Sequence, residues 1–349
     1  MTPSIRYARA SDGASIALAT LGEGAPVLFL PPLPFSHLEA MWESPGQARW
    51  FERLSRHAQV AIYDARGTGL SDRDATGFDV ETQQRDLEAV AARLGWTRFA
   101  VCGFFNASPV ALAYAATHPE SVTEVVLWGG FARGVDVYPM PFALDPALAE
   151  SYWGVVVETA ARMWTAGASE EALQAAAYFR ACVEPATAML AFAAARDADV
   201  SALLPGVRAR TLVLHRRDAS AQRIEVARDL AAAIPSAELR VLPGEAASPF
   251  SGDVDAGVAA VEEFLGLVVA DRTPVDARPA VERPPEGVLT ARETEILRLV
   301  AAGRANKEIA SALGLSVHTV ERHLTNLYPK IGCRSRTEAT AYALTHGYA

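Results

Sequence analysis

The sequence has little cysteine, no long hydrophobic run and fewer basic than acidic residues. Its three cysteines, Cys102, Cys182 and Cys333, are odd in number and far apart, which excludes a disulfide framework or a zinc site built from them. No apolar run reaches the roughly 18 residues that a membrane span requires, and the N-terminal stretch MTPSIRYARASDGAS has no apolar signal segment. We therefore expect neither membrane insertion nor secretion, no bound metal, and a location in a reducing cytoplasm.

The basic residues are also unevenly placed. The 32 lysines and arginines and the 41 aspartates and glutamates give the 349-residue chain a net charge of −9. From Gly287 onward, however, eight basic residues outnumber five acidic ones, so this segment carries +3 and the residues before it carry −12. A basic tail on an acidic body predicts a polyanionic partner for the tail alone. The length and the apolar half of the composition are typical of a globular protein with about two domains.

A proline-rich stretch separates two regions of different character. Between Val269 and Gly287 the sequence VADRTPVDARPAVERPPEG has four prolines and no hydrophobic period. This composition predicts a semi-extended linker over residues 269–287. The first domain is then expected over residues 1–268 and the second over residues 288–349.

The first domain alternates short β-rich runs with amphipathic helical patterns. Continuous apolar strands joined by crossover helices predict an α/β fold with a mostly parallel sheet covered on both faces. The first two strands flank the turn signal Asp12-Gly13 and should pair as an antiparallel edge hairpin. Residues 131–205 have no convincing strand pattern and predict a helical insertion after the sixth strand. The expected strands are residues 4–10, 15–21, 26–30, 59–63, 99–102, 122–127, 211–215 and 238–242.

Two features of this domain resemble the α/β-hydrolase superfamily over roughly residues 4–268. The segment Asp64-Ala-Arg-Gly-Thr-Gly-Leu-Ser71 is similar to the D-x-R-G-x-G-x-S turn after that fold's fourth strand. The helical insertion lies where the family has its cap. The resemblance implies a nucleophile on a strained strand-to-helix turn, an acid after the seventh strand and a histidine after the last strand. It implies the fold, whereas activity depends on the residues at those three positions.

The three catalytic positions of that family hold residues that cannot do the chemistry. The strand-to-helix turn GFFNA places Phe105 at the nucleophile, and Ala219 and Ala247 fall at the acid and at the histidine. No histidine occurs between His215 and His318. Since the loss of one triad member can cost about 10⁶ in turnover, we expect no hydrolysis of esters or amides.

Two interpretations of Phe105 stay open. It is either a core aromatic that fills a vacant cavity or part of the lining of a retained pocket, and an elbow side chain that faces the cap favours the pocket. The backbone N–H groups of Leu33 and Asn106 occupy the family's oxyanion-hole positions and could hold a ligand carbonyl without cleaving it. We therefore expect a site for a small apolar ligand and no cofactor. The predicted ligand-binding residues are Leu33, Phe104, Phe105, Asn106, Ala219 and Ala247.

From Val288 the pattern becomes entirely helical, and four helices are expected. Capping boxes at Thr290-Ala-Arg-Glu293 and Ser335-Arg-Thr-Glu338 predict the starts of the first and the fourth helix. Residues 307–313 predict a short second helix, and Ser316 caps a third. Two short helices joined by a tight glycine turn predict a helix-turn-helix. The apolar face of the third helix consists of Val317, Val320, Leu324 and Leu327.

Four spaced motifs mark this second domain: LTARETEIL at 289–297, NKEIA at 306–310, LSVHTVERH at 315–323 and RSRTEA at 334–339. Together they closely resemble the four-helix DNA-binding domain of LuxR/FixJ-type bacterial regulators. The resemblance implies that the third helix enters the major groove of double-stranded DNA and that the fourth helix mediates homodimerisation. The predicted DNA-binding residues are Lys307, Thr319 and Arg336, placed to hold phosphates, and Glu321, Arg322 and Thr325 on the exposed face of the third helix.

One of these residues departs from the family pattern. Glu321 is acidic where many relatives have a basic residue. It either accepts a hydrogen bond from a cytosine amine or weakens DNA binding in general.

We interpret the chain as a ligand-responsive bacterial transcription regulator, in which a degenerate hydrolase domain senses a small molecule and the C-terminal domain binds promoter DNA. Two alternatives stay open. In one, the first domain is an active hydrolase with an unconventional nucleophile. In the other, it is a dimerisation platform without a ligand, which a pocket filled by side chains would support.

Overall fold

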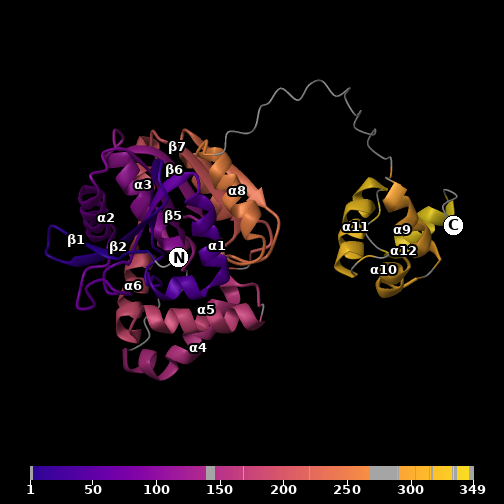
Figure 1. Cartoon of the computed structure of the whole chain (residues 1–349), viewed down its shortest axis with the longest axis horizontal. Coiled ribbons are helices and arrows are strands. Elements are labelled where there is room, and N and C mark those ends of the chain that lie inside the picture. Colours follow the sequence, from indigo (N-terminus) through magenta and orange to yellow (C-terminus); the bar gives the residue numbers. More distant parts are fainter. Residues whose placement is uncertain are drawn as a thin grey trace. The chain divides into compact units, whose positions relative to one another are not determined.

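The computed structural model divides into two compact units, Met1–Asp271 and Arg272–Ala349 (Figure 1). The predicted linker over residues 269–287 lies outside the described residues. Among the described residues, no helix is long and apolar enough to cross a membrane, and no cluster of three or more side chains is suited to hold a metal ion. The described residues are 3–138, 146–167, 169–219, 221–267, 289, 291–302, 304–313, 315, 317–331, 333 and 336–345.

An eight-stranded sheet forms the centre of the first unit, in the order β1-β2-β4-β3-β5-β6-β7-β8. β1 pairs antiparallel with β2, and β2 with β4, whereas every other pair is parallel. The predicted α/β class and edge hairpin are confirmed, and each predicted strand is present within two residues of its expected ends. The strands are β1 (Arg6–Arg9), β2 (Ser15–Leu21), β3 (Ala25–Leu30), β4 (Ala58–Tyr63), β5 (Phe99–Phe104), β6 (Val122–Trp128), β7 (Arg210–Arg216) and β8 (Ala237–Leu242).

Helices cover both faces of the sheet, and the side chains of each strand point alternately to one face and to the other. In β3, Leu28 and Leu30 pack on the face that α2, α3 and α7 cover. Val27 and Phe29 pack on the opposite face, which α1 and α8 cover. This double cover explains the continuous apolar pattern of the central strands. The covering helices are α1 (Pro45–Leu54), α2 (Val80–Leu94), α3 (Ser108–Thr117), α7 (Ile224–Ala233) and α8 (Val254–Phe264).

Three further helices form a cap that is inserted between β6 and β7, which confirms the predicted helical insertion. They lie together at one end of the sheet domain in Figure 1 and pack around an apolar cluster of their own that includes Val157 and Phe179. Phe35, which follows β3, stacks on Phe179 with ring centroids 3.9 Å apart. The cap is therefore held to the carboxyl end of the sheet. Its helices are α4 (Pro146–Trp164), α5 (Ser169–Cys182) and α6 (Pro185–Asp197).

The second unit contains the four predicted helices around a small core. Val320, Leu324 and Leu327, on the predicted apolar face of the third helix, are buried in this core. Lys330 Nζ donates to both carboxylate oxygens of the buried Glu293, at 2.7 and 2.8 Å, and so joins the third helix to the first. The helices are α9 (Ala291–Ala301), α10 (Asn306–Leu313), α11 (Val317–Lys330) and α12 (Arg336–Thr345).

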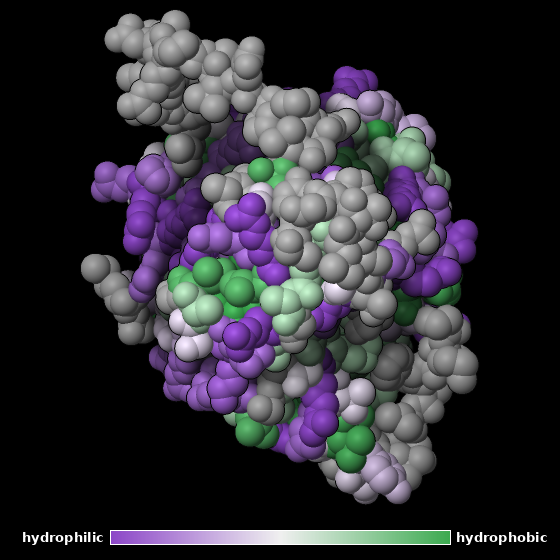
Figure 2. Space-filling view, turned by 90° about the vertical axis from the view of Figure 1, so that its right-hand side faces the viewer, coloured by the Kyte–Doolittle hydropathy of each residue, from purple (hydrophilic) through white to green (hydrophobic). Residues whose placement is uncertain are grey.

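The outer surface contrasts with these cores. On the face shown in Figure 2, hydrophilic side chains predominate and apolar ones gather in a few separate patches. Some of the most exposed large apolar side chains belong to the cap helix α4, where Tyr152 is 55% exposed and Val155 63%.

Candidate functional site

β5 runs into α3 through a sharp turn centred on Phe105. This residue has a φ of +50°, a left-handed conformation that costs roughly 1 to 3 kcal/mol for a residue other than glycine. Space is short at this turn, because a Cβ on Gly103, two residues before Phe105, would lie 3.0 Å from the Cβ of Ala111. In backbone geometry the turn is a nucleophile elbow, with a phenyl ring in place of the nucleophile.

The ring of Phe105 faces the cap. It stacks on the indole of Trp164, at the end of α4, with ring centroids 4.7 Å apart and ring planes at 29°. Both side chains border a cavity of about 550 Å³ at the carboxyl ends of the strands, which we call the cap cavity. In open α/β sheets, ligands commonly bind at this end of the strands.

The cap cavity has an apolar wall, and its described lining contains no charged residue. The wall comes from one side of α4, from the segments after β3, β5, β6 and β7, and from α6. Polar groups are few and are contributed mainly by Asn106, Gln222, Thr159 and two tyrosines. The lining residues are Leu33, Phe35, Phe105, Asn106, Phe131, Val137, Tyr138, Tyr152, Val155, Val156, Thr159, Ala160, Met163, Trp164, Phe192, Ala221 and Gln222.

Two buried amides fix the polar end of this cavity. Asn106 Nδ2 donates to the carbonyl of Leu33 and so ties the turn after β5 to the segment after β3. Gln222 Nε2 donates in the same way to the carbonyl of Gly129, after β6. Asn106 is 7% exposed, and its Oδ1 atom is buried without a hydrogen-bond partner among the described residues.

Three of the six predicted ligand-binding residues, Leu33, Phe105 and Asn106, border the cap cavity. Phe104 does not. β5 extends through Phe104, so strand alternation turns this ring into the sheet core, where it packs edge-on against Phe29 with ring centroids 4.3 Å apart.

Ala219 and Ala247 also lie outside the lining of the cap cavity. Ala219 is only partly buried at the edge of the core that α1 and α8 cover. Ala247 is buried, and its carbonyl accepts a hydrogen bond of 2.8 Å from the indole of Trp128. The small side chains at these two predicted catalytic positions therefore do not reach the cavity.

A buried arginine holds the loop that follows β8. Arg216, at the end of β7, is 3% exposed and donates to the carbonyls of Ser251 at 2.5 Å and Asp253 at 3.1 Å. Its guanidinium lies 5.4 Å from the ring centroid of Trp128. Burial lowers the pKa of Arg216 because the charged form loses its hydration. A cation thus anchors the loop that would carry the histidine in an active hydrolase.

The nearest hydroxyl to the elbow along the chain is also enclosed. Ser108 is 0% exposed, and its Oγ lies 3.5 Å from the carbonyl of Gly103. His215, on β7, is 2% exposed, and burial lowers its pKa. The sequence of the elbow and of the loops after β7 and β8 contains no histidine that could serve as the base.

The turn after β4 retains the polar network of its motif. Asp64 Oδ2 accepts from the N–H groups of Leu38 at 3.1 Å and Leu70 at 2.8 Å, while burial raises the pKa of Asp64 to about 7. Arg66 pairs with the buried Asp86 at 2.6 Å and with Asp12 at 2.9 Å. These contacts position the turn at the base of the cap.

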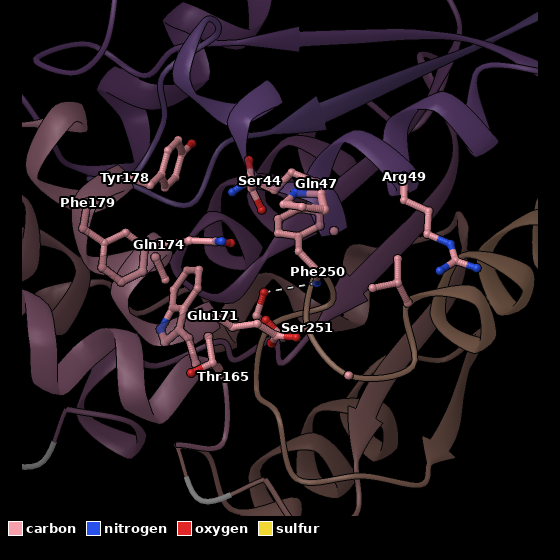
Figure 3. Close-up of a pocket in the computed structure, with 17 residues that line it drawn as sticks. Ser44, Gln47, Arg49, Thr165, Glu171, Gln174, Tyr178, Phe179, Phe250 and Ser251 are labelled. Atoms are coloured by element: carbon pink, nitrogen blue, oxygen red, sulfur yellow. Dashed lines mark hydrogen bonds between the residues drawn. The ribbon is translucent and has the colours of Figure 1, made fainter. Parts of the chain in front are cut away.

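A second, more polar pocket of about 250 Å³ lies between the cap, the start of α1 and the loop before α8 (Figure 3). Trp164 lines both this side pocket and the cap cavity. Polar and charged side chains line it, including Ser44, Arg49 and Glu171. The dashed line in Figure 3 is the 3.1 Å hydrogen bond from the Phe250 N–H to Ser248 Oγ.

Sequence reasoning missed most of the wall that the cap contributes. On α4, the residues that border the cap cavity recur every three or four positions, which is the spacing of one helix face. That stripe is visible in the sequence, but an apolar stripe can equally pack against another helix. The spacing alone could therefore not assign it to a cavity.

In the second unit, Lys307 is exposed near the start of α10. Arg336 reaches the same place, because its guanidinium donates to Asn306 Oδ1 at 2.9 Å and to the carbonyl of Arg304. Thr319 is half-buried in the first turn of α11. The side chains of Glu321, Arg322 and Thr325 lie outside the described residues, although their positions fall on α11.

Comparison with known proteins identifies both units. Residues 25–252 match the family described as "alpha/beta hydrolase fold", so the chain belongs to this family. Residues 287–343 match the family described as "Bacterial regulatory proteins, luxR family", so a LuxR-type domain is fused to the hydrolase-fold domain.

Solved structures show the same hydrolase fold. An esterase from Exiguobacterium antarcticum is 21% identical, with a TM-score of 0.64, over 74% of this chain and 98% of its own. The enol-lactonase from Burkholderia xenovorans LB400 is 23% identical, with a TM-score of 0.63, over 75% of this chain and 100% of its own. At such identities the likeness establishes the fold and not the activity.

Curated relatives match the LuxR-type domain. The transcriptional regulatory protein MctR of Rhizobium johnstonii is 48% identical over 68 residues, which are 19% of this chain and 32% of that protein. The response regulator protein VraR of Staphylococcus aureus is 46% identical over 59 residues, which are 17% of this chain and 28% of that protein. The chain thus spans about a third of the length of these relatives.

Proposed function

We propose that the chain is a one-component transcription regulator. The hydrolase-fold domain binds a small apolar molecule in the cap cavity, and the LuxR-type domain of a homodimer binds promoter DNA. The observation that carries this proposal is a cavity of about 550 Å³ at an elbow whose nucleophile position holds Phe105. A binding site without a nucleophile, fused to a DNA-binding domain, is suited to sensing.

The same residues argue against catalysis. Hydrolysis by this fold needs a nucleophile, a base and an acid that are in mutual contact. Phe105 supplies none of these, Ala247 does not border the cavity, and Arg216 anchors the loop where the base would stand. We therefore propose that the hydrolase-fold domain binds without cleaving.

The cap cavity also favours a sensor over a dimerisation platform without a ligand. A volume of about 550 Å³ lies within the range of sites for drug-sized ligands, and side chains leave it open. Tyr152 and Val155 border it and are more than half exposed, so a bound apolar molecule would cover surface that otherwise faces water.

DNA binding is supported by the geometry at the start of α10. Lys307 and Arg336 bring two positive charges to this end of the helix, where backbone N–H groups also favour a phosphate. The predicted base-reading positions Glu321, Arg322 and Thr325 fall on α11, the helix whose Val320, Leu324 and Leu327 are buried in the core. A ligand would alter DNA affinity only through a different affinity for the two conformations of the dimer.

Selection of bound duplexes from a random DNA library by the full-length protein tests the proposal. We expect enrichment of a two-fold symmetric site whose half-sites lie about one helical turn apart. Native mass spectrometry of the freshly purified protein should reveal a co-purified small molecule. A protein that selects no sequence, or binds duplexes no better than its Lys307→Ala/Arg322→Ala variant, would not be this regulator.

A further inference from the structure

β8 is an edge strand of the sheet, and half of its backbone groups face outward. Among the described residues, no strand lies on its outer side. The N–H of Thr211, on β7, donates to the carbonyl of Ser236, the residue before β8, at 3.1 Å, so the backbone groups of the even-numbered residues face β7. Because these groups alternate along a strand, the N–H and C=O groups of Leu239 and Val241 point away from the sheet.

The two edges of the sheet differ in how well they are covered. β1, at the far edge, has only four residues, and Arg93 Nε donates to the carbonyl of Tyr7 at 3.1 Å. β8 has six residues and pairs with β7 without a bulge. No hydrogen bond from the described residues reaches the outward groups of Leu239 and Val241, and Val241 is 36% exposed. An uncovered edge of this kind is a template for a further strand.

The charges on β8 make the strand complementary to a second copy of itself. Glu238 and Arg240 lie two residues apart on one side of the sheet, with side chains 54% and 30% exposed. Charges on an edge strand oppose pairing where like charges meet. In an antiparallel pair centred on Leu239, however, Glu238 of each protomer lies opposite Arg240 of the other. The outward groups of Leu239 and Val241 then occupy the hydrogen-bonded positions.

We propose that two copies of the chain pair antiparallel through β8, centred on Leu239, so that their sheets form one continuous sheet. This inference rests on the proposed homodimer and identifies the surface that the hydrolase-fold unit contributes to it. The two-fold axis is perpendicular to the sheet, so both copies of α8 lie on the same face. The pairing uses the β8 edge of both protomers and therefore closes at two copies.

A proline at an outward position tests the pairing. Val241→Pro removes an N–H group that makes no bond to β7, and proline is tolerated at such positions of an edge strand. Sedimentation of the full-length protein over a range of concentrations should give a dimer dissociation constant at least about tenfold higher than that of the unaltered protein. Val241→Thr keeps the N–H group and is the matched control. An unchanged dissociation constant for a folded Val241→Pro protein, or an unaltered protein that stays monomeric, would overturn the proposal.

Exchange of the two charges tests the complementarity and does not depend on the proline variant. Glu238→Arg and Arg240→Glu each place like charges opposite one another and should weaken dimerisation. The double variant Glu238→Arg/Arg240→Glu restores opposite charges and should recover most of the affinity. Melting curves control for folding, because Arg240 also pairs with Glu263 on α8 at 2.8 Å. A double variant that dimerises no better than the single variants would refute this register.

Disulfide formation reads the register directly. Directly opposed residues at non-hydrogen-bonded positions have Cα atoms about 4.5 Å apart, which a disulfide can span. In a Cys333→Ser background, which removes the one native cysteine that is not buried, a mixture of Glu238→Cys and Arg240→Cys proteins should cross-link on oxidation, and neither should cross-link alone. Cross-linking of Arg240→Cys alone would place the centre at residue 240 and refute the register.

DNA selection by the full-length protein separates this inference from the proposed function. Cross-linking through β8 without sequence-specific DNA binding would retain the surface and reject the regulator. Sequence-specific binding by a protein that does not cross-link through β8 would retain the regulator and reject the surface.

Discussion

The two units of this protein differ in how far their residues match the role of the family that each unit resembles. In the hydrolase-fold unit, the sheet, the cap, the strained elbow and the Asp64 turn are all present, yet the elbow holds Phe105 where a nucleophile is expected. In the LuxR-type unit, the capping boxes, the helices and the basic residues near the start of α10 all agree with DNA binding. A scaffold is held together by many dispersed contacts, whereas catalysis depends on three side chains, so the chemistry can be lost while the fold remains.

The largest expected effect concerns hydrolysis itself. Because Phe105, Ala219 and Ala247 stand at all three predicted catalytic positions, the full-length protein should hydrolyse activated esters no faster than background. An intact hydrolase triad accelerates turnover about 10⁶-fold over the same scaffold without its nucleophile. A serine-directed fluorophosphonate should leave the protein unlabelled in mass spectra. Labelling that maps to Ser108 would show that the hydrolase-fold unit retains a reactive nucleophile, and the contrast between the two units would not hold.

Phe105 should combine a structural and a binding role. Phe105→Ala should lower the free energy of unfolding by about 3 kcal/mol, because it removes a buried ring that stacks on Trp164. Phe105→Gly should be no less stable than Phe105→Ala, since glycine adopts the φ of +50° without strain. Urea unfolding followed by tryptophan fluorescence measures both, because all six tryptophans lie in the first unit.

Phe104→Ala is the matched control for this position. Phe104 is buried in the sheet core and does not border the cap cavity. Its loss should lower stability at least as much as Phe105→Ala, yet leave binding of a small apolar molecule in the cap cavity unchanged in the protein that remains folded. A change in stability alone for both variants would make Phe105 a core residue only.

Asp64 should make the hydrolase-fold unit less stable as the pH rises. Its pKa is about 7 in the folded chain and near 3.8 in the unfolded one, so the folded state binds the proton more tightly. Its contribution to stability therefore falls as the pH rises from about 4 to about 7, and the full penalty applies above that range. Asp64→Asn removes the ionisation, so its stability relative to the unaltered protein should rise between about pH 4 and about pH 8, by up to about 4 kcal/mol.

Asp12 is the control for this pH dependence, because its contribution to stability changes with pH in the opposite direction. The hydrogen bond from Arg66 lowers the pKa of Asp12, so Asp12 stabilises the fold above its unfolded pKa and loses that effect as the pH falls. Asp12→Asn should therefore destabilise most at neutral pH and least in acid. Melting curves of the three proteins at several pH values should diverge in these directions. Parallel curves for Asp64→Asn and the unaltered protein would refute the assignment.

The smallest expected effect tests the second unit. Lys307→Ala should weaken binding to all duplexes about equally and reduce the slope of log affinity against log salt by about one. Arg322→Ala should cost about 1 to 3 kcal/mol on the selected site and scarcely change non-specific binding. Fluorescence anisotropy over a range of salt concentrations separates the two. Identical salt slopes for Lys307→Ala and the unaltered protein would remove Lys307 from the interface.

The sheet could be predicted from sequence because burial on both faces imposes a pattern on every central strand. Ser15–Leu21 was predicted to the residue, and apolar pairs such as Val27 and Leu28 reveal a strand with two buried faces. Phe104 was assigned to the wrong surroundings because β5 runs two residues beyond the predicted end at Cys102. Alternation then carries Phe104 into the core and leaves Phe105 at the turn.

The cap cavity could be predicted only in part. Leu33, Phe105 and Asn106 are fixed by the elbow and the end of β3, which local motifs reveal. Which side of α4 faces inward depends on packing against Phe35 and α6, residues far apart in the chain, and no local pattern encodes that choice. The isolated acceptor of Asn106 likewise arises from a tertiary hydrogen bond to Leu33.

The buried Arg216 bears on whether the proposed loss of activity could be reversed in evolution. Its guanidinium holds the carbonyls of Ser251 and Asp253, while Trp128 holds that of Ala247, so the loop after β8 has an anchor unrelated to any triad. A lineage that regained serine, aspartate and histidine at the three positions would still have this anchor in place. Restoring the three side chains alone would therefore leave a loop after β8 that is positioned by Arg216 and Trp128 and not by a histidine.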